Sequence, residues 1–182
     1  MARSGDRFEM IDGSVYAVTK SAADAGGEYV EMEFTLPPKA VSPPPHIHAE
    51  LSEEYEVIEG ALDVMIDGEW QTLTPGQSAA IAPGTLHTFK NRTSGTVRVR
   101  NVHRPPARFE DYIQRIHDVL AARGITSARD PRVPIYLSMV MLQYPETLAP
   151  GRAPERIGIK AMAGLGRLLR FDAELGAPGR LA

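Results

Sequence analysis

The sequence predicts an all-β domain, a sandwich or a small barrel, followed by a helical extension. Between residues 28 and 104, short runs of alternating apolar and polar residues are separated by turn signals rich in Gly, Pro and Asp. Beyond residue 104 the alternation gives way to apolar residues at helical spacing. We therefore divide the chain into an N-terminal segment (1–27), a barrel (28–104) and a helical C-terminal extension (105–182).

The strands are predicted from patterns with a period of two residues. Apolar side chains occupy every second position from 30 to 36, which is typical of a strand with one buried face. Asp67-Gly68 is a strong signal for a two-residue hairpin turn. The first 27 residues indicate only weak strands or coil. Further short strands are expected at residues 54–60, 62–67, 70–73, 78–82, 87–91 and 96–102.

Three helices are predicted in the extension. Residues 108–124 have apolar side chains at helical spacing and end at a glycine, and residues 133–144 are apolar nearly all round and should be buried. Residues 154–171 form a basic amphipathic pattern that contains three glycines. The glycines favour close packing of this helix against another backbone, on the barrel or on a second subunit. The alternative is contact with a membrane surface.

The composition excludes several classes of protein. The 182 residues contain no cysteine, which rules out a disulfide scaffold, a thiolate metal site and a cysteine nucleophile. The net charge of −3 argues against nucleic-acid binding. No apolar run is long enough to span a membrane, and the N-terminal residues lack the apolar stretch of a secretion signal, so we expect a cytoplasmic protein.

The charge is unevenly distributed along the chain. Residues 1–91 contain 5 Lys and Arg against 15 Asp and Glu, whereas residues 92–182 contain 15 against 8. This difference is consistent with a solvated, basic helical surface in the second half. It is also consistent with acidic and basic surfaces that meet, within one chain or between chains.

Histidine and glutamate residues gather between positions 46 and 87. His46 and His48 are two residues apart, so on an extended segment both imidazoles point to the same side. Glu53 and Glu54 follow, and His87 comes after a Pro-Gly turn at the start of another predicted strand. A His-x-His pair alone is often a surface feature. Three imidazoles and a carboxylate on neighbouring strands instead form a mixed nitrogen and oxygen site that suits Fe, Mn, Ni, Cu or Zn.

The first of these clusters resembles a motif of the cupin superfamily. That motif ends in His-x-His, four residues, Glu, six residues and Gly, which His46, His48, Glu53 and Gly60 match at every position. The resemblance covers about residues 28–103. No known motif covers the helical extension.

A second cupin motif follows 15 residues after Gly60. It consists of Gly, five residues, Pro-x-Gly, two residues, His, three residues and Asn. Gly76, Gly84, His87 and Asn91 stand at the family's offsets. The family's proline position holds Ala82, with a proline one residue later. This shift preserves the turn chemistry and changes no residue at a ligand position.

The resemblance implies a jelly roll, with one divalent transition metal held inside one mouth of the barrel. The implied ligands are His46, His48, Glu53 and His87. Side-chain alternation does not decide between Glu53 and Glu54, but the distance to Gly60 favours Glu53, with Glu54 as the alternative.

Neighbouring residues are expected to support the site. Asn91 should stabilise the turn or strand end near His87 by hydrogen bonds. Tyr55 either lines the cavity or packs in the core. His103, at the end of the last predicted strand, is interpreted as a structural histidine with satisfied hydrogen bonds, the alternative being a cap on the barrel mouth.

The leading functional hypothesis is a metal-dependent, dioxygenase-like oxidoreductase that acts on a small organic molecule. The alternatives are a non-redox isomerase or lyase that uses the metal as a Lewis acid, and a non-catalytic module that binds a small ligand. No catalytic residue beyond the metal ligands is assigned, so Glu53 is the candidate proton acceptor. We expect a homodimer, because jelly-roll edges and an apolar helix both need cover.

Overall fold

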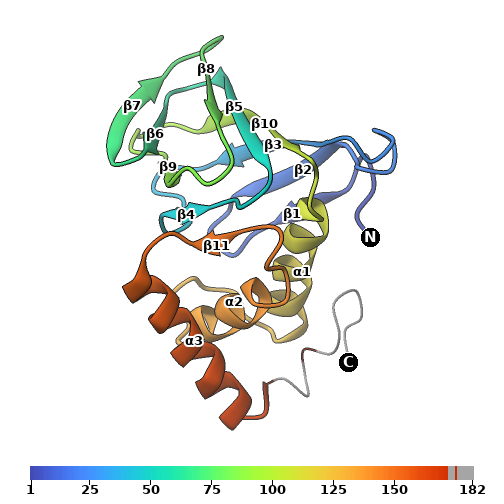
Figure 1. The fold of residues 1–182 in the computed structure, drawn as a ribbon, viewed down its shortest axis with the longest axis vertical. Helices are drawn as coiled ribbons and strands as arrows, with labels where there is room; N and C mark the ends of the chain where they lie inside the picture. The colour runs from blue at the N-terminus through green and yellow to red at the C-terminus, as the bar shows by residue number, and fades with distance from the viewer. Residues whose placement is uncertain (172–174, 176–182) are drawn as a thin grey trace.

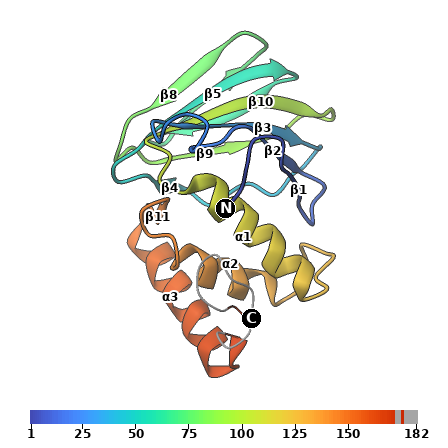
Figure 2. The same cartoon turned by 90° about the vertical axis from the view of Figure 1, so that its right-hand side faces the viewer.

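Two antiparallel sheets enclose an apolar interior in the computed structural model, which describes residues 1–171 and residue 175 (Figure 1). The larger sheet has six strands in the order β1-β2-β3-β10-β5-β8, and the smaller has five in the order β11-β4-β9-β6-β7. Three helices follow the barrel in the chain and pack below it (Figures 1 and 2). The predicted fold class, an all-β jelly roll with a helical extension, is confirmed.

Most strands and the three helices fall close to their predicted positions, whereas the two-residue strands at 46–47 and 149–150 were not predicted. The strands of the larger sheet are β1 (Arg7–Glu9), β2 (Val15–Lys20), β3 (Val30–Leu36), β5 (Ser52–Glu59), β8 (Ser78–Ile81) and β10 (Val97–Arg104). Those of the smaller sheet are β4 (His46–Ile47), β6 (Leu62–Ile66), β7 (Glu69–Leu73), β9 (His87–Lys90) and β11 (Ala149–Pro150). The helices are α1 (Phe109–Ala122), α2 (Val133–Met141) and α3 (Ala153–Leu168).

The interior of the barrel follows the alternation that predicts it. Val30, Met32, Phe34 and Leu36 of β3 are all buried, and the polar residues between them lie toward the outside. β3 pairs with β10 in register, so the inward residues of both strands share one face. The Asp67-Gly68 hairpin joins β6 to β7, with both residues at positive φ as a tight hairpin turn requires.

The acidic and basic halves of the sequence meet on the outer face of the larger sheet. Arg100 of β10 binds Glu31 of β3 at 2.7 Å and Glu56 of β5 at 3.2 Å. Arg98 contacts Glu33 at 3.0 Å in the same way. The central strand β10 therefore supplies cations to acidic neighbours on both sides. Because these pairs are partly exposed, each contributes about 0.2–1 kcal/mol.

The helical extension is packed as one layer. α2 is buried between α1 and α3, as its apolar sequence predicts. Gly166 of α3 lies so close to α2 that a Cβ there would clash with the sulfur of Met139. A Cβ at Gly158 or Gly164 would have no heavy atom of the described chain within 4 Å, so close packing within the chain is found at Gly166 and not at the other two. Packing of those two glycines against a second subunit stays a prediction. Of the described helices, none is both long enough and apolar enough to cross a membrane.

Candidate metal centre

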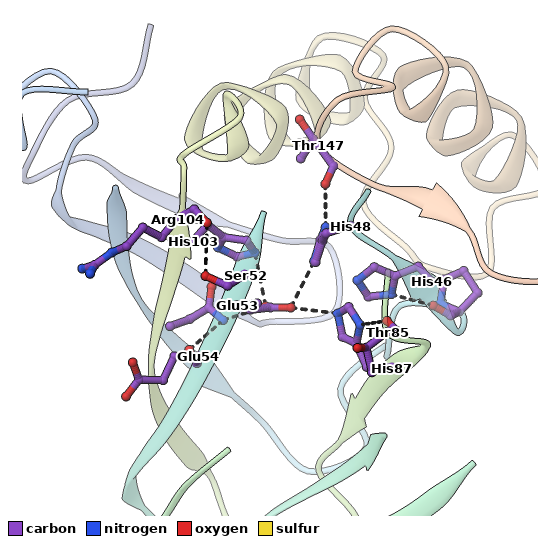
Figure 3. Close-up of polar contacts among 12 residues, drawn as sticks. His46, His48, Ser52, Glu53, Glu54, Thr85, His87, His103, Arg104 and Thr147 are labelled. Atoms are coloured by element: carbon purple, nitrogen blue, oxygen red, sulfur yellow. Dashed lines mark hydrogen bonds and ion pairs between the residues drawn. The ribbon is translucent and has the colours of Figure 1, made fainter. Parts of the chain in front are cut away.

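Three histidines converge at one mouth of the barrel (Figure 3). His46 begins β4, His48 follows that strand, and His87 begins β9. His46 and His87 are direct partners in the antiparallel β4–β9 pair, which brings residues 41 positions apart onto neighbouring strands. Together with Glu53, these side chains form a buried group whose ligating atoms lie within 4.8 Å of one another. The four residues expected as metal ligands are therefore adjacent in space.

Glu53 and Glu54 occupy opposite faces of β5. Glu53 is 3% exposed and its carboxylate points at the histidines, whereas Glu54 is exposed and points away from them (Figure 3). Glu53 Oε2 is 3.1 Å from His48 Nε2 and 2.8 Å from His87 Nε2. The structure thus brings Glu53, and not Glu54, into the histidine cluster.

Backbone carbonyls determine which nitrogen of each imidazole faces the cluster. His46 Nδ1 lies 2.9 Å from the carbonyl of Pro44, and His87 Nδ1 lies 2.9 Å from the carbonyl of Thr85. His48 Nδ1 contacts the carbonyl of Thr147 at 2.5 Å. Since a carbonyl oxygen only accepts hydrogen bonds, each Nδ1 carries the hydrogen. Each neutral ring then has its Nε2 lone pair free for a ligand.

This arrangement fits a bound cation. The lone pairs of His48 Nε2 and His87 Nε2 face the same negatively charged oxygen of Glu53 at hydrogen-bond distance. Such a contact is repulsive unless a proton or a metal ion lies between the atoms. Four buried donors, three nitrogens and one carboxylate, form a set that Fe, Mn, Ni, Cu and Zn accept.

Burial and mutual contact shift the pKa values of the cluster. Burial, followed by the charges of His87 and His48, lowers the pKa of His46 to about 3. Burial alone would raise the pKa of Glu53, but the surrounding imidazoles, His103 foremost, hold it well below its usual value. Burial also opposes protonation of His87, yet its contact with Glu53 outweighs burial and raises the His87 pKa. A metal ion bound at this site would therefore compete with a proton on His87 that the contact with Glu53 favours.

A further polar group, which the sequence did not assign to the site, lies on the other side of Glu53. Asn101 Nδ2 donates a hydrogen bond to Glu53 Oε1 at 2.7 Å, and His103 Nε2 is 3.3 Å from the same oxygen. His103 is fully buried and stacks on Phe109 at 3.6 Å between ring centroids, and burial lowers its pKa. These contacts occupy Oε1 and leave Oε2 directed at the histidines.

The expectation that His103 has satisfied hydrogen bonds is met at one ring nitrogen only. His103 Nε2 contacts Glu53 Oε1 at 3.3 Å, whereas among the described residues Nδ1 has no hydrogen-bond partner, and the same is true of Tyr55 Oη and Asn101 Oδ1. Tyr55 is 1% exposed and packs edge-on against Phe89, so its ring belongs to the core. Strand β10 pairs with β5 so that His103 lies opposite Glu53 and Asn101 lies opposite Tyr55. His103 and Asn101 are two residues apart, so their side chains point to the same face of β10. This spacing was the signal in the sequence that could have placed both side chains beside the Glu53 carboxylate.

The helical extension contributes directly to the centre. Thr147, which lies between α2 and β11, provides the carbonyl that orients His48. β11 then pairs with β4, with Pro150 opposite His46. Gly151 lies so close to Leu86 that a Cβ at position 151 would clash with the Leu86 side chain. The sequence offered no motif for this contact, because Thr147 acts through its backbone and is 99 residues away from His48.

Motif residues outside the ligand set support the local backbone. Asn91 Nδ2 donates to the carbonyls of Leu36 and Gly95 at 3.0 and 2.8 Å, which confirms its expected role at the strand end. Gly60 has a φ of 81°, and a Cβ there would be 2.7 Å from the carbonyl of Thr96. Only glycine combines that conformation with that proximity.

Comparison with known proteins agrees with the fold and the motif residues. Residues 32–103 match the family of the cupin domain, and this range contains the metal-ligand candidates, Asn101 and His103. Residues 32–103, which make up most of the barrel, therefore form a cupin domain.

Individual relatives match only parts of the chain. The HTH-type transcriptional regulator SutR of Escherichia coli (strain K12) is 39% identical over 54 residues, which are 29% of this chain and 30% of the regulator. Quercetin 2,3-dioxygenase of Bacillus subtilis (strain 168) is 27% identical over 96 residues, or 53% of this chain and 28% of the dioxygenase. The chain thus matches less than a third of the length of either curated relative.

A solved structure was also matched over the barrel. The cupin domain of an XRE family transcriptional regulator from Enterobacter cloacae is 29% identical and has a TM-score of 0.44. The match covers 50% of this chain and 95% of that domain.

Proposed function

We propose that the chain binds one divalent redox metal through His46, His48, Glu53 and His87 and is a dioxygenase-like oxidoreductase for a small organic substrate. The observation that carries this proposal is the convergence of three Nε2 lone pairs and one carboxylate in a buried cluster. The cupin domain and the partial match to a quercetin dioxygenase support it. Iron, manganese, nickel and copper are the metals that suit this chemistry.

A metal in this site would supply open coordination positions and redox chemistry with dioxygen. The protein's own residues prepare the site in three ways. The carbonyls behind the histidines hold the hydrogen on each Nδ1 and leave each Nε2 aimed at the centre. Glu53 provides a single negative charge, so the site remains net positive and attracts an anionic oxygen ligand. The low exposure of all four residues excludes bulk water.

The substrate class follows from the donor set. A small molecule with two adjacent oxygens, such as an enediol, a catechol-like diol or a keto acid, suits open positions on a centre that already has four protein ligands. A diol must lose a proton when it binds as an anion. Glu53 is the candidate to accept that proton. The imidazole of His103, which is neutral and lies beside Glu53 Oε1, is a second candidate acceptor.

The proposal is tested by titration of the iron- or manganese-loaded protein with such chelators without oxygen, followed by addition of oxygen. We expect a chelator to change the metal's absorption or paramagnetic spectrum and the complex to consume oxygen. If no diol, enediol or keto acid perturbs the spectrum and no oxygen is consumed, the oxidoreductase proposal is wrong. A zinc-loaded protein with turnover but no oxygen uptake would instead support the Lewis-acid alternative.

A second candidate function is favoured by the match to a transcriptional regulator over 54 residues. In that case the barrel binds a small ligand without converting it. The same titration separates the two functions, because a ligand-binding module would show the spectral change with a chelator that is recovered unaltered after exposure to oxygen.

A further inference from the structure

Helix α3 carries an apolar stripe that the described residues leave uncovered. Ile157, Leu165 and Leu168 are 70%, 40% and 79% exposed. With Ala161 they recur every three or four positions, so they share one face of the helix. Met162 and Leu169 widen the stripe at 40% and 50% exposure. The other exposed large apolar side chains of the described chain are dispersed over other elements.

The orientation of this stripe is determined by the opposite face of α3. Ala163 is fully buried, and Gly166 packs against Met139 and Ile135 of α2. The stripe therefore faces away from α2. In both views α3 runs along the lower-left edge of the helical layer, on the far side of α2 from α1 (Figures 1 and 2). A flat surface can contact the helix along its length.

A row of cations lies beside the apolar stripe. Arg156, Lys160 and Arg167 are exposed and share one side of α3. None of them forms an ion pair with a carboxylate in the described part of the chain. Glu155, the one acidic side chain of α3, is used at the start of the helix, where its Oε2 accepts a hydrogen bond from the Arg152 backbone at 3.2 Å.

We propose that α3 is a docking surface for an anionic lipid membrane. The helix lies flat in the interface, with the stripe of Ile157, Leu165 and Leu168 in the upper acyl region and the cationic row next to the lipid phosphates. Long basic side chains bury their methylene stems while their charges stay at the headgroups. The inference does not depend on the metal centre, because α3 contains none of the residues of that site.

The charge pattern favours lipid over other occupants. Pairing of α3 with α3 of a second copy would bring the same cationic row of each chain to one interface, where like charges repel. A nucleic acid would satisfy the cations but would leave the exposed isoleucine and leucines in water. An anionic bilayer satisfies both features at once.

The test is flotation of the full chain with vesicles of phosphatidylcholine alone and of equal parts phosphatidylcholine and phosphatidylglycerol. We expect binding to the anionic vesicles only, weakening as salt is added. Lys160→Glu with Arg167→Glu should weaken binding by at least about 25-fold, since each basic residue near an anionic surface contributes about fivefold. Ile157→Glu with Leu168→Glu should abolish binding while the circular dichroism and thermal unfolding of the protein stay unchanged.

Matched controls make the outcome decisive. Arg7→Glu with Lys39→Glu produces the same change of net charge on exposed residues elsewhere, and Ile58→Glu places an acid at another exposed apolar position. Both control proteins should bind vesicles like the wild type. Failure of the wild type to float with anionic vesicles overturns the proposal. Conversion of a wild-type dimer into a monomer by Ile157→Glu with Leu168→Glu would also overturn it and assign the stripe to a second copy.

Discussion

Asn101→Ala is the substitution that best separates an organised metal centre from a merely buried cluster. Asn101 is fully buried, and its amide donates to Glu53 Oε1 at 2.7 Å. The substitution removes this donor and leaves every metal-ligand candidate in place. Glu53 Oε1 then keeps only the 3.3 Å contact with His103, so the orientation of the carboxylate is less firmly fixed.

The expected magnitude follows from that contact. A hydrogen bond to a charged group contributes about 1.5–3 kcal/mol, and here the acceptor is a carboxylate buried in the barrel. We expect the free energy of unfolding to fall by roughly 2–3 kcal/mol. Loss of an outer partner that orients a ligand typically weakens metal binding by about 10–100-fold, and we expect a loss in that range.

Asn91→Ala is the matched control. Asn91 is also buried and donates to the backbone carbonyls of Leu36, Pro37 and Gly95, but it does not contact Glu53. It should destabilise the protein by a similar amount and leave the metal affinity of the folded protein unchanged. The assay is urea unfolding together with metal competition against a chromophoric chelator. Equal metal affinity in wild type and Asn101→Ala, or an equal loss in both variants, would refute the reasoning.

The other predictions concern the ligands, the helical packing and the assembly. His48→Ala should remove most bound metal in elemental analysis, and Glu53→Gln should weaken binding while Glu54→Gln does not; the reverse result would move the carboxylate ligand to Glu54. Gly166→Ala should lower the free energy of unfolding by about 1–3 kcal/mol, because the added Cβ clashes with α2. Gly164→Ala places its Cβ in open space and should raise the free energy of unfolding by about 0.5–1 kcal/mol. Similar effects of the two substitutions would contradict the packing of α3 on α2. Light scattering at micromolar concentration should give the mass of a homodimer, and a monomer mass would contradict that expectation.

Most of the barrel could be predicted from local patterns. The strand with apolar residues at positions 30 to 36 is buried on one face, because a period of two residues is enough to define which side packs inward. The cluster of His46, His48, Glu53 and His87 followed from motif spacing, since spacing reflects the register of neighbouring strands. Alternation alone did not distinguish Glu53 from Glu54. Only the placement of β5 in the sheet shows which of them faces the cluster.

The features that the sequence did not reveal depend on distant contacts. Thr147 acts on His48 through a backbone carbonyl, and any residue type has one, so no side-chain pattern marks it. β4 and β11 are two residues long, too short for a periodic signal. His103 was interpreted as a structural histidine, with a cap on the barrel mouth as the alternative, because its pairing opposite Glu53 becomes visible only in the sheet. Within the described chain the third helix is tightly packed on one face only, since the glycines at 158 and 164 are on the exposed face.

The metal content of the full chain, purified without a metal-affinity tag, tests the central claim most directly. We expect elemental analysis of the wild type to find one divalent transition metal per chain, with iron, manganese, nickel or copper as the species. His87→Ala, measured alongside, should retain little of it, because the substitution removes a proposed ligand, the direct strand partner of His46. A wild type that binds no metal when these ions are supplied, or a His87→Ala protein with the same metal content as the wild type, would contradict the account.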